Sequence, residues 1–227
     1  GPPELAQPPE GKPMLKLIPT LLHLLFMANA PAVFASAISP IGDITVHPLD
    51  GPQTTLFKTG AAATVLVFVG HDCPISNQYS RELQRIHKLY FPRKVTFWIV
   101  YSEELITISE ARKHYKEFGF TCDAAYDPGH KLVRFAHATV TPEVVLYDSN
   151  GQLAYSGRID NLFYSFGKRR YDVTAHDLIN ALDCVLANKP VIHRRTSPVG
   201  CFIPPLTKHR SAINDSNLPV EVPYIFT

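Results

Sequence analysis

The sequence predicts an α/β domain in three layers, with a central mixed β-sheet flanked by helices. Apolar β-branched runs alternate along the chain with segments of helical periodicity, which is the pattern of parallel strand–helix–strand units. A strand hairpin and a closing helix follow, so the sheet is expected to be mixed. With 227 residues, 45% of them hydrophobic and 19% charged, the chain is long enough for one such core with extensions.

The first half of the predicted domain alternates strands with helices. An apolar run that ends at Gly70 predicts a buried central strand. Ser76 is expected to cap the helix that follows, and Thr107 with Glu110 has the spacing of a capping box. The expected elements are a short strand within 38–60, a strand over 61–69, a helix over 76–90, a strand over 94–101 and a helix over 107–118.

The second half is expected to end in a hairpin, a helix and an extended tail. Ser149-Asn150-Gly151 predicts the hairpin turn, whereas residues 161–173 show no periodicity and are expected to be irregular. Prolines from residue 190 onward indicate a tail packed on the domain. The expected elements are a strand over 122–126, a helix over 131–138, strands over 143–147 and 152–159, and a helix over 174–187.

The flanks carry a targeting signature. Residues 1–13 are rich in proline and are interpreted as an upstream extension. Residues 14–37 have a basic start, an apolar stretch and a small-residue ending, which together predict a signal peptide cleaved after Ala37. Prolines interrupt that stretch, so a cleaved signal is favoured over a membrane anchor. The domain is expected to span 38–193, with a Pro-rich tail over 194–227.

Charge and cysteine content narrow the function classes. The formal net charge of +2 is too small to indicate nucleic acid or an anionic membrane as a partner. The predicted export places the protein in the periplasm or outside the cell, without stable membrane insertion after cleavage, and thiols there persist as disulfides. The four cysteines include no Cys-x-x-Cys pair, which argues against a structural zinc site. They are Cys73, Cys122, Cys184 and Cys201.

Cys73 stands where chemistry is expected in a sheet of this kind. It follows the predicted central strand and precedes a helix, at the edge of the sheet where sites gather. The positive end of the helix dipole and its free N–H groups favour thiolate over thiol. Pro74 fits the first helical position because its missing N–H is no loss there. These features predict a nucleophile, and the alternative is a buried cysteine that only packs.

The residues around Cys73-Pro74 resemble the thioredoxin-like superfamily, and in particular its redoxin branch of thiol-specific antioxidant and TlpA-like proteins. Val140-Thr141-Pro142 before a strand and the hairpin over 146–160 also resemble this branch, over about residues 38–189. The segment Val199-Gly200-Cys201-Phe202-Ile203 is similar to the tails of some exported redoxins. The resemblance implies a thioredoxin-like fold, a redox-active Cys73, and a cis Pro142 that faces it and shapes the docking edge.

The sequence departs from the patterns of these relatives at several positions. Ser76 stands where a thioredoxin has its second cysteine, so no neighbouring thiol can resolve a mixed disulfide on Cys73. Gly70 stands where a peroxiredoxin has a threonine, and the activating arginine is missing near Pro142, with Arg158 or a residue of Lys168-Arg169-Arg170 as the substitute. The Cys-x-x-x-Cys motif of the copper chaperones is also missing.

Cys201 is the preferred candidate to resolve Cys73, because the Pro-rich tail can fold back over the end of the sheet. Cys122 is the next candidate, and Cys184, which lies beside the apolar stripe of the last predicted helix, is expected only to pack. A bridge requires a particular geometry, so the sequence leaves open whether Cys201 is a disulfide partner.

Three functions therefore remain. The first is an extracytoplasmic thiol–disulfide oxidoreductase acting on protein or small-molecule thiols and disulfides, with no cofactor. The second is a thiol peroxidase of the same fold, in which Cys73 passes through a sulfenic acid. The third is a non-enzymatic copper-binding or assembly factor that uses His71 and Cys73, with Cys201 as a further soft ligand. His71 lies two residues before Cys73, where its cationic form would also favour the thiolate.

Overall fold

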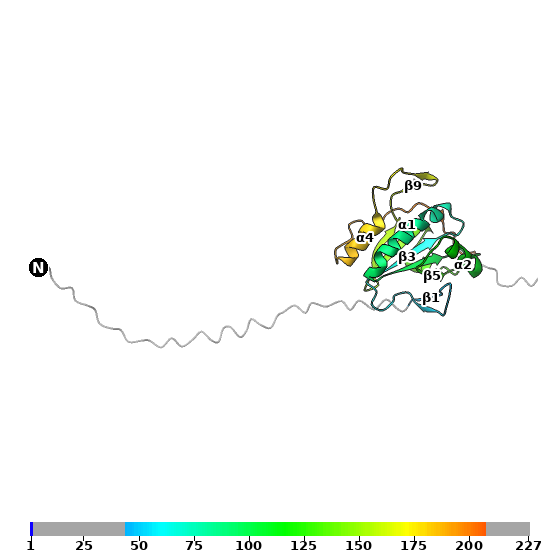
Figure 1. The fold of residues 1–227 in the computed structure, drawn as a ribbon, viewed down its shortest axis with the longest axis horizontal. Coiled ribbons are helices and arrows are strands. Elements are labelled where there is room, and N and C mark those ends of the chain that lie inside the picture. The colour runs from blue at the N-terminus through cyan, green and yellow to red at the C-terminus, as the bar shows by residue number, and fades with distance from the viewer. Residues whose placement is uncertain (2–43, 208–227) are drawn as a thin grey trace, which may run out of the picture. The chain divides into compact units, whose positions relative to one another are not determined.

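The computed structural model describes residues 44–207 and Gly1 (Figure 1). The chain divides into two units, and all described helices and strands lie in the second unit, residues 39–227. The predicted upstream extension 1–13, the predicted signal peptide 14–37 and the last part of the tail, 208–227, lie outside the described residues. Within the part that is described, no helix is long and apolar enough to span a bilayer.

The centre of the domain is the five-stranded mixed sheet that the sequence predicts. Its strand order is β5-β4-β3-β7-β8. Neighbouring strands β3, β4 and β5 run parallel, whereas β7 is antiparallel to β3 and β8 is antiparallel to β7. The predicted α/β fold with helices around a mixed sheet is thereby confirmed. The strands are β3 (Ala63–Val69), β4 (Val95–Tyr101), β5 (Asp123–Tyr126), β7 (Glu143–Asp148) and β8 (Leu153–Gly157).

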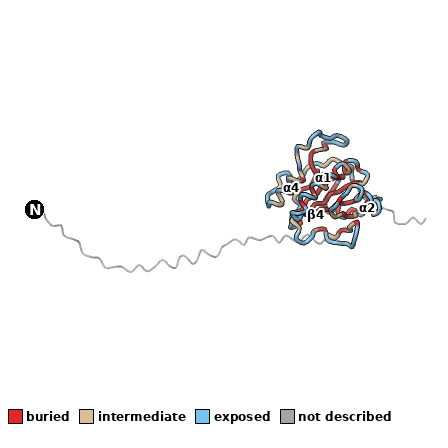
Figure 2. Tube along the Cα trace, viewed as in Figure 1, coloured by how far each residue is buried: buried red, intermediate tan, exposed pale blue. Residues whose placement is uncertain are grey.

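The central strand β3 is continuously apolar because both of its faces are covered. All seven of its residues are buried. Since side chains alternate along a strand, Val65 and Val67 belong to the core cluster on one face, and Leu66 and Phe68 belong to the cluster on the other. In Figure 2, buried segments run through the middle of the domain and exposed segments lie around its edge.

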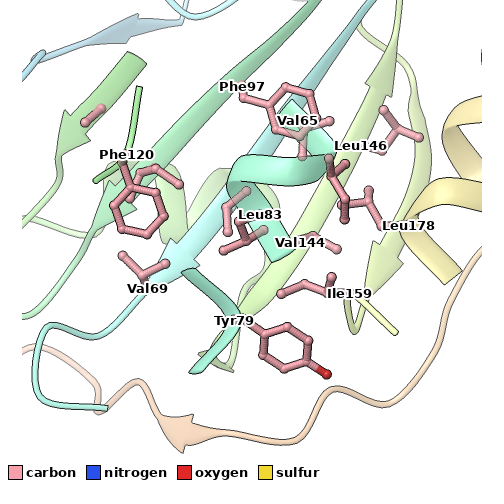
Figure 3. Packing of buried hydrophobic residues seen from close by; sticks show 14 of the residues in the cluster. Val65, Val69, Tyr79, Leu83, Phe97, Phe120, Val144, Leu146, Ile159 and Leu178 are labelled. Carbon is pink, nitrogen blue, oxygen red and sulfur yellow. The ribbon is translucent and has the colours of Figure 1, made fainter. Parts of the chain in front are cut away.

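The first face of the sheet is covered by the longer helices. These are α1 (Pro74–Tyr90), α2 (Ile108–Glu117) and α4 (Asp177–Leu186). Tyr79 and Leu83 of α1 and Leu178 of α4 join strand residues in a single core cluster, part of which is drawn in Figure 3. The capping box predicted at Thr107 and Glu110 is present, and it starts α2 where the sequence predicts. A 3-10 turn, η1 (Phe91–Arg93), follows α1.

The second face carries shorter elements. They are the short helix α3 (Lys131–Ala136) and the hairpin of β1 (Thr45–Val46) and β2 (Thr54–Thr55). Leu132 and Leu56 pack there with Trp98 of β4, whose indole N–H donates to the Leu56 carbonyl at 3.2 Å. The domain therefore has the three layers that the sequence predicts.

The start of α1 differs from the sequence-based expectation. The helix begins at Pro74, with Cys73 as the N-cap residue, and not at Ser76. Pro74 starts the helix because its φ is already helical and it needs no hydrogen bond for an N–H. Ser76 is buried in the first turn, and its hydroxyl accepts the Gly70 N–H at 3.3 Å. The prediction that Ser76 caps the helix was wrong, and the serine ties the preceding loop to the helix instead.

Residues 161–173 contain a hairpin that the sequence analysis missed. Strands β9 (Phe163–Ser165) and β10 (Lys168–Arg169) pair antiparallel, with Gly167 at a φ of 68° between them. Figure 1 shows β9 standing out from the rest of the domain. Most of this hairpin is exposed, so no buried face imposes the alternation from which a strand is recognised.

The tail returns to the sheet and forms its own strand pair. Strand β11 (Cys201–Phe202) pairs antiparallel with β6 (Val140–Thr141), which leads into β7. Up to residue 207, where the described residues end, the tail is extended and packs on the domain. It brings Cys201 to the start of α1.

Candidate functional site

A disulfide joins Cys73 to Cys201 across 128 residues of chain. The two Cα atoms lie 6.1 Å apart. Cys73 comes from the start of α1, and Cys201 comes from the tail strand β11. The structure therefore brings together two of the cysteines singled out in the sequence, and Cys201 supplies the sulfur that the position of Ser76 lacks.

Pro142 lies beside this bridge. The Thr141–Pro142 peptide bond is cis, as the resemblance implied. The Thr141 carbonyl oxygen lies 3.1 Å from Cys73 Sγ. A disulfide sulfur has no hydrogen to donate, but a reduced Cys73 thiol in this position donates to that carbonyl. The sulfur of Cys73 therefore lies against the Thr141 carbonyl, on the strand that precedes Pro142.

Two glycines allow the chain segments to come this close. A Cβ atom on Gly70 would lie 2.9 Å from Thr141 Oγ1 and 3.0 Å from Cys73 Cβ, which is closer than such atoms approach. A Cβ on Gly200 would overlap the Thr141 carbonyl and the nitrogen of Pro142. Any larger residue at either position pushes the loop or the tail away from Thr141. The sequence analysis noted Gly70 only as a departure from peroxiredoxins, and it gave Gly200 no role.

The bridge lines a cavity of about 210 Å³. His71 and Glu103 line the same cavity, as does Ile203 of the tail. Glu103 Oε1 accepts the His71 backbone N–H at 2.6 Å and lies 3.0 Å from the ring Nδ1. The other ring nitrogen of His71 lies 3.2 Å from Asp72 Oδ2. His71 is therefore held by carboxylates on both sides, next to the bridge.

Glu103 is a site residue that the sequence analysis missed. Its second oxygen, Oε2, is buried and has no hydrogen-bond partner within the described part of the chain. An unpaired carboxylate oxygen is an acceptor for a proton or a water molecule. Its position two residues beyond β4, at the same edge of the sheet as Cys73, was the signal that could have found it.

A chain of hydrogen bonds connects the Cys73 loop to the core. Asn77 donates from Nδ2 to the His71 carbonyl at 3.1 Å, and its Oδ1 lies 2.8 Å from His114 Nε2. Tyr101 Oη lies 2.8 Å from His114 Nδ1. Burial, and then the charge of His71, lower the pKa of His114, and burial raises the pKa of Tyr101. The neutral His114 ring therefore accepts from the tyrosine and donates to the asparagine.

The other two cysteines take no part in this site. Cys122 and Cys184 are free thiols. Burial is the main cause that raises the pKa of Cys122 to about 12, which leaves almost no thiolate near neutral pH. Cys122 was the second candidate to resolve Cys73, but in the structure Cys201 holds that position.

The predicted copper ligands do not gather into a metal site. Nowhere in residues 44–207 do three His, Cys, Asp or Glu side chains form a group that could hold a metal ion. His71 faces carboxylates, and the sulfur of Cys73 is bonded to Cys201. The geometry gives the copper hypothesis no third ligand among these residues.

Comparisons with known proteins place the fold more firmly than the activity. No protein-family model matches the sequence, and no curated protein matches it. A hypothetical protein from Sinorhizobium meliloti is similar in structure, with 26% identity and a TM-score of 0.62 over 71% of this chain and 90% of that one. An uncharacterized conserved protein from Geobacillus kaustophilus has 24% identity and a TM-score of 0.59 over the same shares.

A secreted disulfide oxidoreductase from Mycobacterium tuberculosis, homologous to DsbE of Escherichia coli, is less similar. Its identity is 15% and its TM-score is 0.46, over 64% of this chain and 96% of that one. A likeness of this degree carries nothing about activity. The mixed sheet, the cysteine at the start of α1 and the cis proline beside it have the arrangement of a thioredoxin-like fold. In this chain the cysteine at the helix start is bonded to a cysteine of the tail.

Proposed function

We propose that this chain is an extracytoplasmic thiol–disulfide oxidoreductase in which Cys73 is the nucleophile and Cys201 the resolving thiol. The observation that carries the proposal is the Cys73–Cys201 bridge at the start of α1, beside cis Pro142. A cysteine at a helix N-terminus is favoured as thiolate, which is the species that attacks disulfides. Cys201 lies on a short strand of the tail. In this proposal it moves away from Cys73 when the bridge is reduced and comes back to re-form it.

The reaction begins from the reduced protein. The Cys73 thiolate attacks one sulfur of a substrate disulfide, whose S–S bond breaks, and the released sulfur takes up a proton as the first product thiol. Cys201 then attacks Cys73 Sγ in the mixed disulfide, forms the bridge seen here and releases the second thiol. Two electrons pass from Cys73 and Cys201 to the substrate. A dithiol protein or a small-molecule thiol returns them in the next cycle.

Glu103 is the group that accepts a proton in this mechanism. Cys201 must lose its proton to attack, and the carboxylate of Glu103 lines the cavity that both sulfurs share. Its Oε2 is buried and unpaired among the described residues, so a water in the cavity can bridge it to the sulfur. In this proposal Glu103 takes up the proton of the attacking thiol.

The peroxidase alternative has less support. A threonine at position 70 would have its Cβ 2.9 Å from Thr141 Oγ1, so the loop has no room for that residue. Arg158, the substitute for the missing activating arginine, is held by Asp177 at 2.7 Å. The threonine is therefore missing, and Arg158 is engaged by an acidic partner of its own.

We also propose that the protein acts outside the cytoplasm, in the periplasm or beyond the cell. Residues 14–37 have the pattern of a signal peptide, and a disulfide between Cys73 and Cys201 persists in an oxidising compartment. Fractionation of cells that express the chain with residues 14–37 in place tests this part. Retention in the cytoplasm would contradict it.

The activity is tested with the purified chain, reduced and mixed with insulin as a disulfide substrate. We expect Cys73→Ser to lose the exchange and Cys201→Ser to accumulate a mixed disulfide on Cys73. Cys184→Ser is the matched control and should keep the activity. Thiol titration after peroxide treatment separates the alternative: peroxide consumption by Cys73 without disulfide exchange would support the peroxidase and contradict the oxidoreductase.

A further inference from the structure

A hairpin that projects from the domain takes no part in the disulfide site. It pairs β9 with β10, and Figure 1 shows it standing out from the rest of the domain. All residues from 164 to 172 are exposed. An isolated two-stranded hairpin is only marginally stable in water, so the conformation of this one depends on what holds its base.

The base of the hairpin is held by buried contacts. Asn161, which is 8% exposed, accepts the backbone N–H groups of Thr174 and Ala175 at 2.9 and 3.0 Å through its side-chain oxygen. Its side-chain nitrogen donates to Thr174 Oγ1 at 2.7 Å. Phe163 packs against Tyr79 of α1, with the ring centroids 5.6 Å apart. The domain therefore holds both ends of the hairpin segment and keeps it in its projecting position.

The projecting segment carries three large aromatic side chains in water. Tyr164 is 55% exposed, Phe166 is 64% exposed and Tyr171 is 99% exposed. Single exposed apolar residues are normal on a protein surface, but three rings within one short segment form a cluster. Burying a ring stabilises a protein, so a cluster of rings that the fold keeps in water indicates a surface that a partner covers.

The same segment concentrates positive charge. Lys168, Arg169 and Arg170 are exposed, and Asp172 is the only acidic residue between positions 163 and 173. None of the three basic residues has a carboxylate within 4.0 Å in the part of the chain that the structure describes. The formal net charge of +2 for the whole chain conceals this local excess, because acidic residues elsewhere offset it.

An anionic lipid surface fits both properties of the hairpin. A projecting tip offers no hollow for a small ligand, and a protein partner would need a groove shaped to receive it. A lipid interface deforms around such a tip, and tyrosine and phenylalanine rings are favoured at the level of the headgroups. Lysine and arginine beside the rings are attracted to the negative charge of the lipids.

We propose that the β9–β10 hairpin binds the surface of a membrane that contains anionic phospholipids. Tyr164, Phe166 and Tyr171 enter the headgroup region, and Lys168 and Arg169 contact the lipid phosphates. The contact is peripheral, because only the tip of one hairpin enters the interface. The hairpin carries neither cysteine of the bridge, so this inference stands or falls separately from the proposed exchange activity.

The test places a fluorescent reporter at the tip of the hairpin in the full chain. Phe166→Trp adds a tryptophan there, while the natural Trp98 is buried at 1% exposure and supplies a constant background. The probe is a vesicle of phosphatidylcholine with brominated acyl chains and phosphatidylglycerol in roughly equal amounts. We expect these vesicles to quench the added emission roughly twofold, and vesicles without phosphatidylglycerol to quench it much less.

Phe91→Trp is the matched control for position in the fold. Phe91 is 67% exposed, close to the value for Phe166, and it lies in η1 away from the hairpin. Any general attachment of the chain to vesicles affects both variants alike, because the rest of the sequence is the same. The tryptophan of the Phe91→Trp chain should therefore be quenched no more than Trp98.

A second variant tests the charge. Lys168→Gln with Arg169→Gln is added to Phe166→Trp, and Arg170 is left in place because its Nη1 donates to the Asn161 carbonyl at 2.7 Å and supports the base. Each basic residue near an anionic surface contributes about fivefold to binding, so half-maximal quenching should require roughly twentyfold more lipid.

Lys113→Gln with Lys116→Gln removes the same charge from exposed positions on α2 and should leave the lipid requirement unchanged. Equal quenching in Phe91→Trp and Phe166→Trp would overturn the inference, as would an equal lipid requirement for the two charge variants. If polyglutamate shifts the emission of the Phe166→Trp chain and vesicles do not quench it, the partner is an acidic polypeptide and the membrane inference is wrong.

Discussion

The four cysteines fall into two groups: two that are joined in a disulfide and two that are free thiols. Cys73 and Cys201 meet at the sheet edge, where β3 ends and the tail crosses β6. Cys122 and Cys184 stay apart as free thiols in or beside secondary structure. Burial does not separate the pairs, because Cys73 is as well buried as many core residues, at 3% exposure. Backbone position therefore decides which cysteines meet: Cys73 and Cys201 lie on segments that the fold brings together, whereas Cys122 and Cys184 do not.

The largest expected difference between the pairs is in alkylation rate. In the reduced protein at pH 8, iodoacetamide should label Cys122 roughly a thousandfold more slowly than an ordinary cysteine of pKa about 8.5, because the pKa of Cys122 is raised to about 12. Peptide mass spectrometry gives the rate for each site. Labelling in urea is the control and should make all four cysteines alike. Native labelling of Cys122 at the urea rate would contradict the comparison.

The Cys73–Cys201 bridge should also stabilise the folded protein more than either of the two free cysteines does. It closes a loop of 128 residues, so reduction is expected to lower the free energy of unfolding by about 5 kcal/mol through the greater entropy of the reduced unfolded chain. Urea unfolding with and without dithiothreitol measures the difference. Dithiothreitol should leave the stability of Cys73→Ser unchanged. A fall in that variant as well would place the effect elsewhere.

A smaller effect tests the close contact between the Cys73 loop and Thr141. Gly70→Ala should cost roughly 1 to 3 kcal/mol of stability and slow the formation of the bridge, because the new Cβ meets Thr141 Oγ1 and Cys73 Cβ. Gly129→Ala is the matched control, since nothing lies within 4 Å of a Cβ there. Its change should stay within about 0.5 kcal/mol. Equal losses in both variants would show that the contact is not specific to the site.

The smallest effect concerns the polar chain that joins the site to the core. The pKa of His114 is lowered by burial and then by His71, so the unfolded chain binds a proton that the folded protein does not. Stability is therefore complete above about pH 6.5, the ordinary histidine value, and falls as the pH drops from there to the lower pKa of the folded protein. Thermal unfolding at pH 8 and pH 5.5 measures this slope.

His114→Gln should reduce the dependence of the melting temperature on pH, by a few degrees at most over that range. His47→Gln is the control, because His47 lies in an exposed part of the chain. If the melting temperature of His114→Gln depends on pH as strongly as that of the natural chain, His114 is not the cause of this pH dependence.

Most strands and helices were predictable because their residues are buried on a regular period. The run over β3, the capping box at Thr107 and the turn after β7 each left a local pattern. The hairpin of β9 and β10 was not predictable in this way, since it is mostly exposed. The start of α1 was misplaced by two residues because Ser76 is a common N-cap, whereas Pro74 sets the helix earlier.

The sequence by itself determined the α/β class and the place of Cys73 before a helix, because local periodicity and the strand–helix step are properties of adjacent residues. Only the tertiary structure decided which cysteine meets Cys73, since Cys201 lies 128 positions further along the chain and the two meet only when the chain folds. The tertiary structure also gives Gly200 and Glu103 their roles in the site. Their importance lies in what they touch across the sheet edge, and no neighbour in the sequence records those contacts.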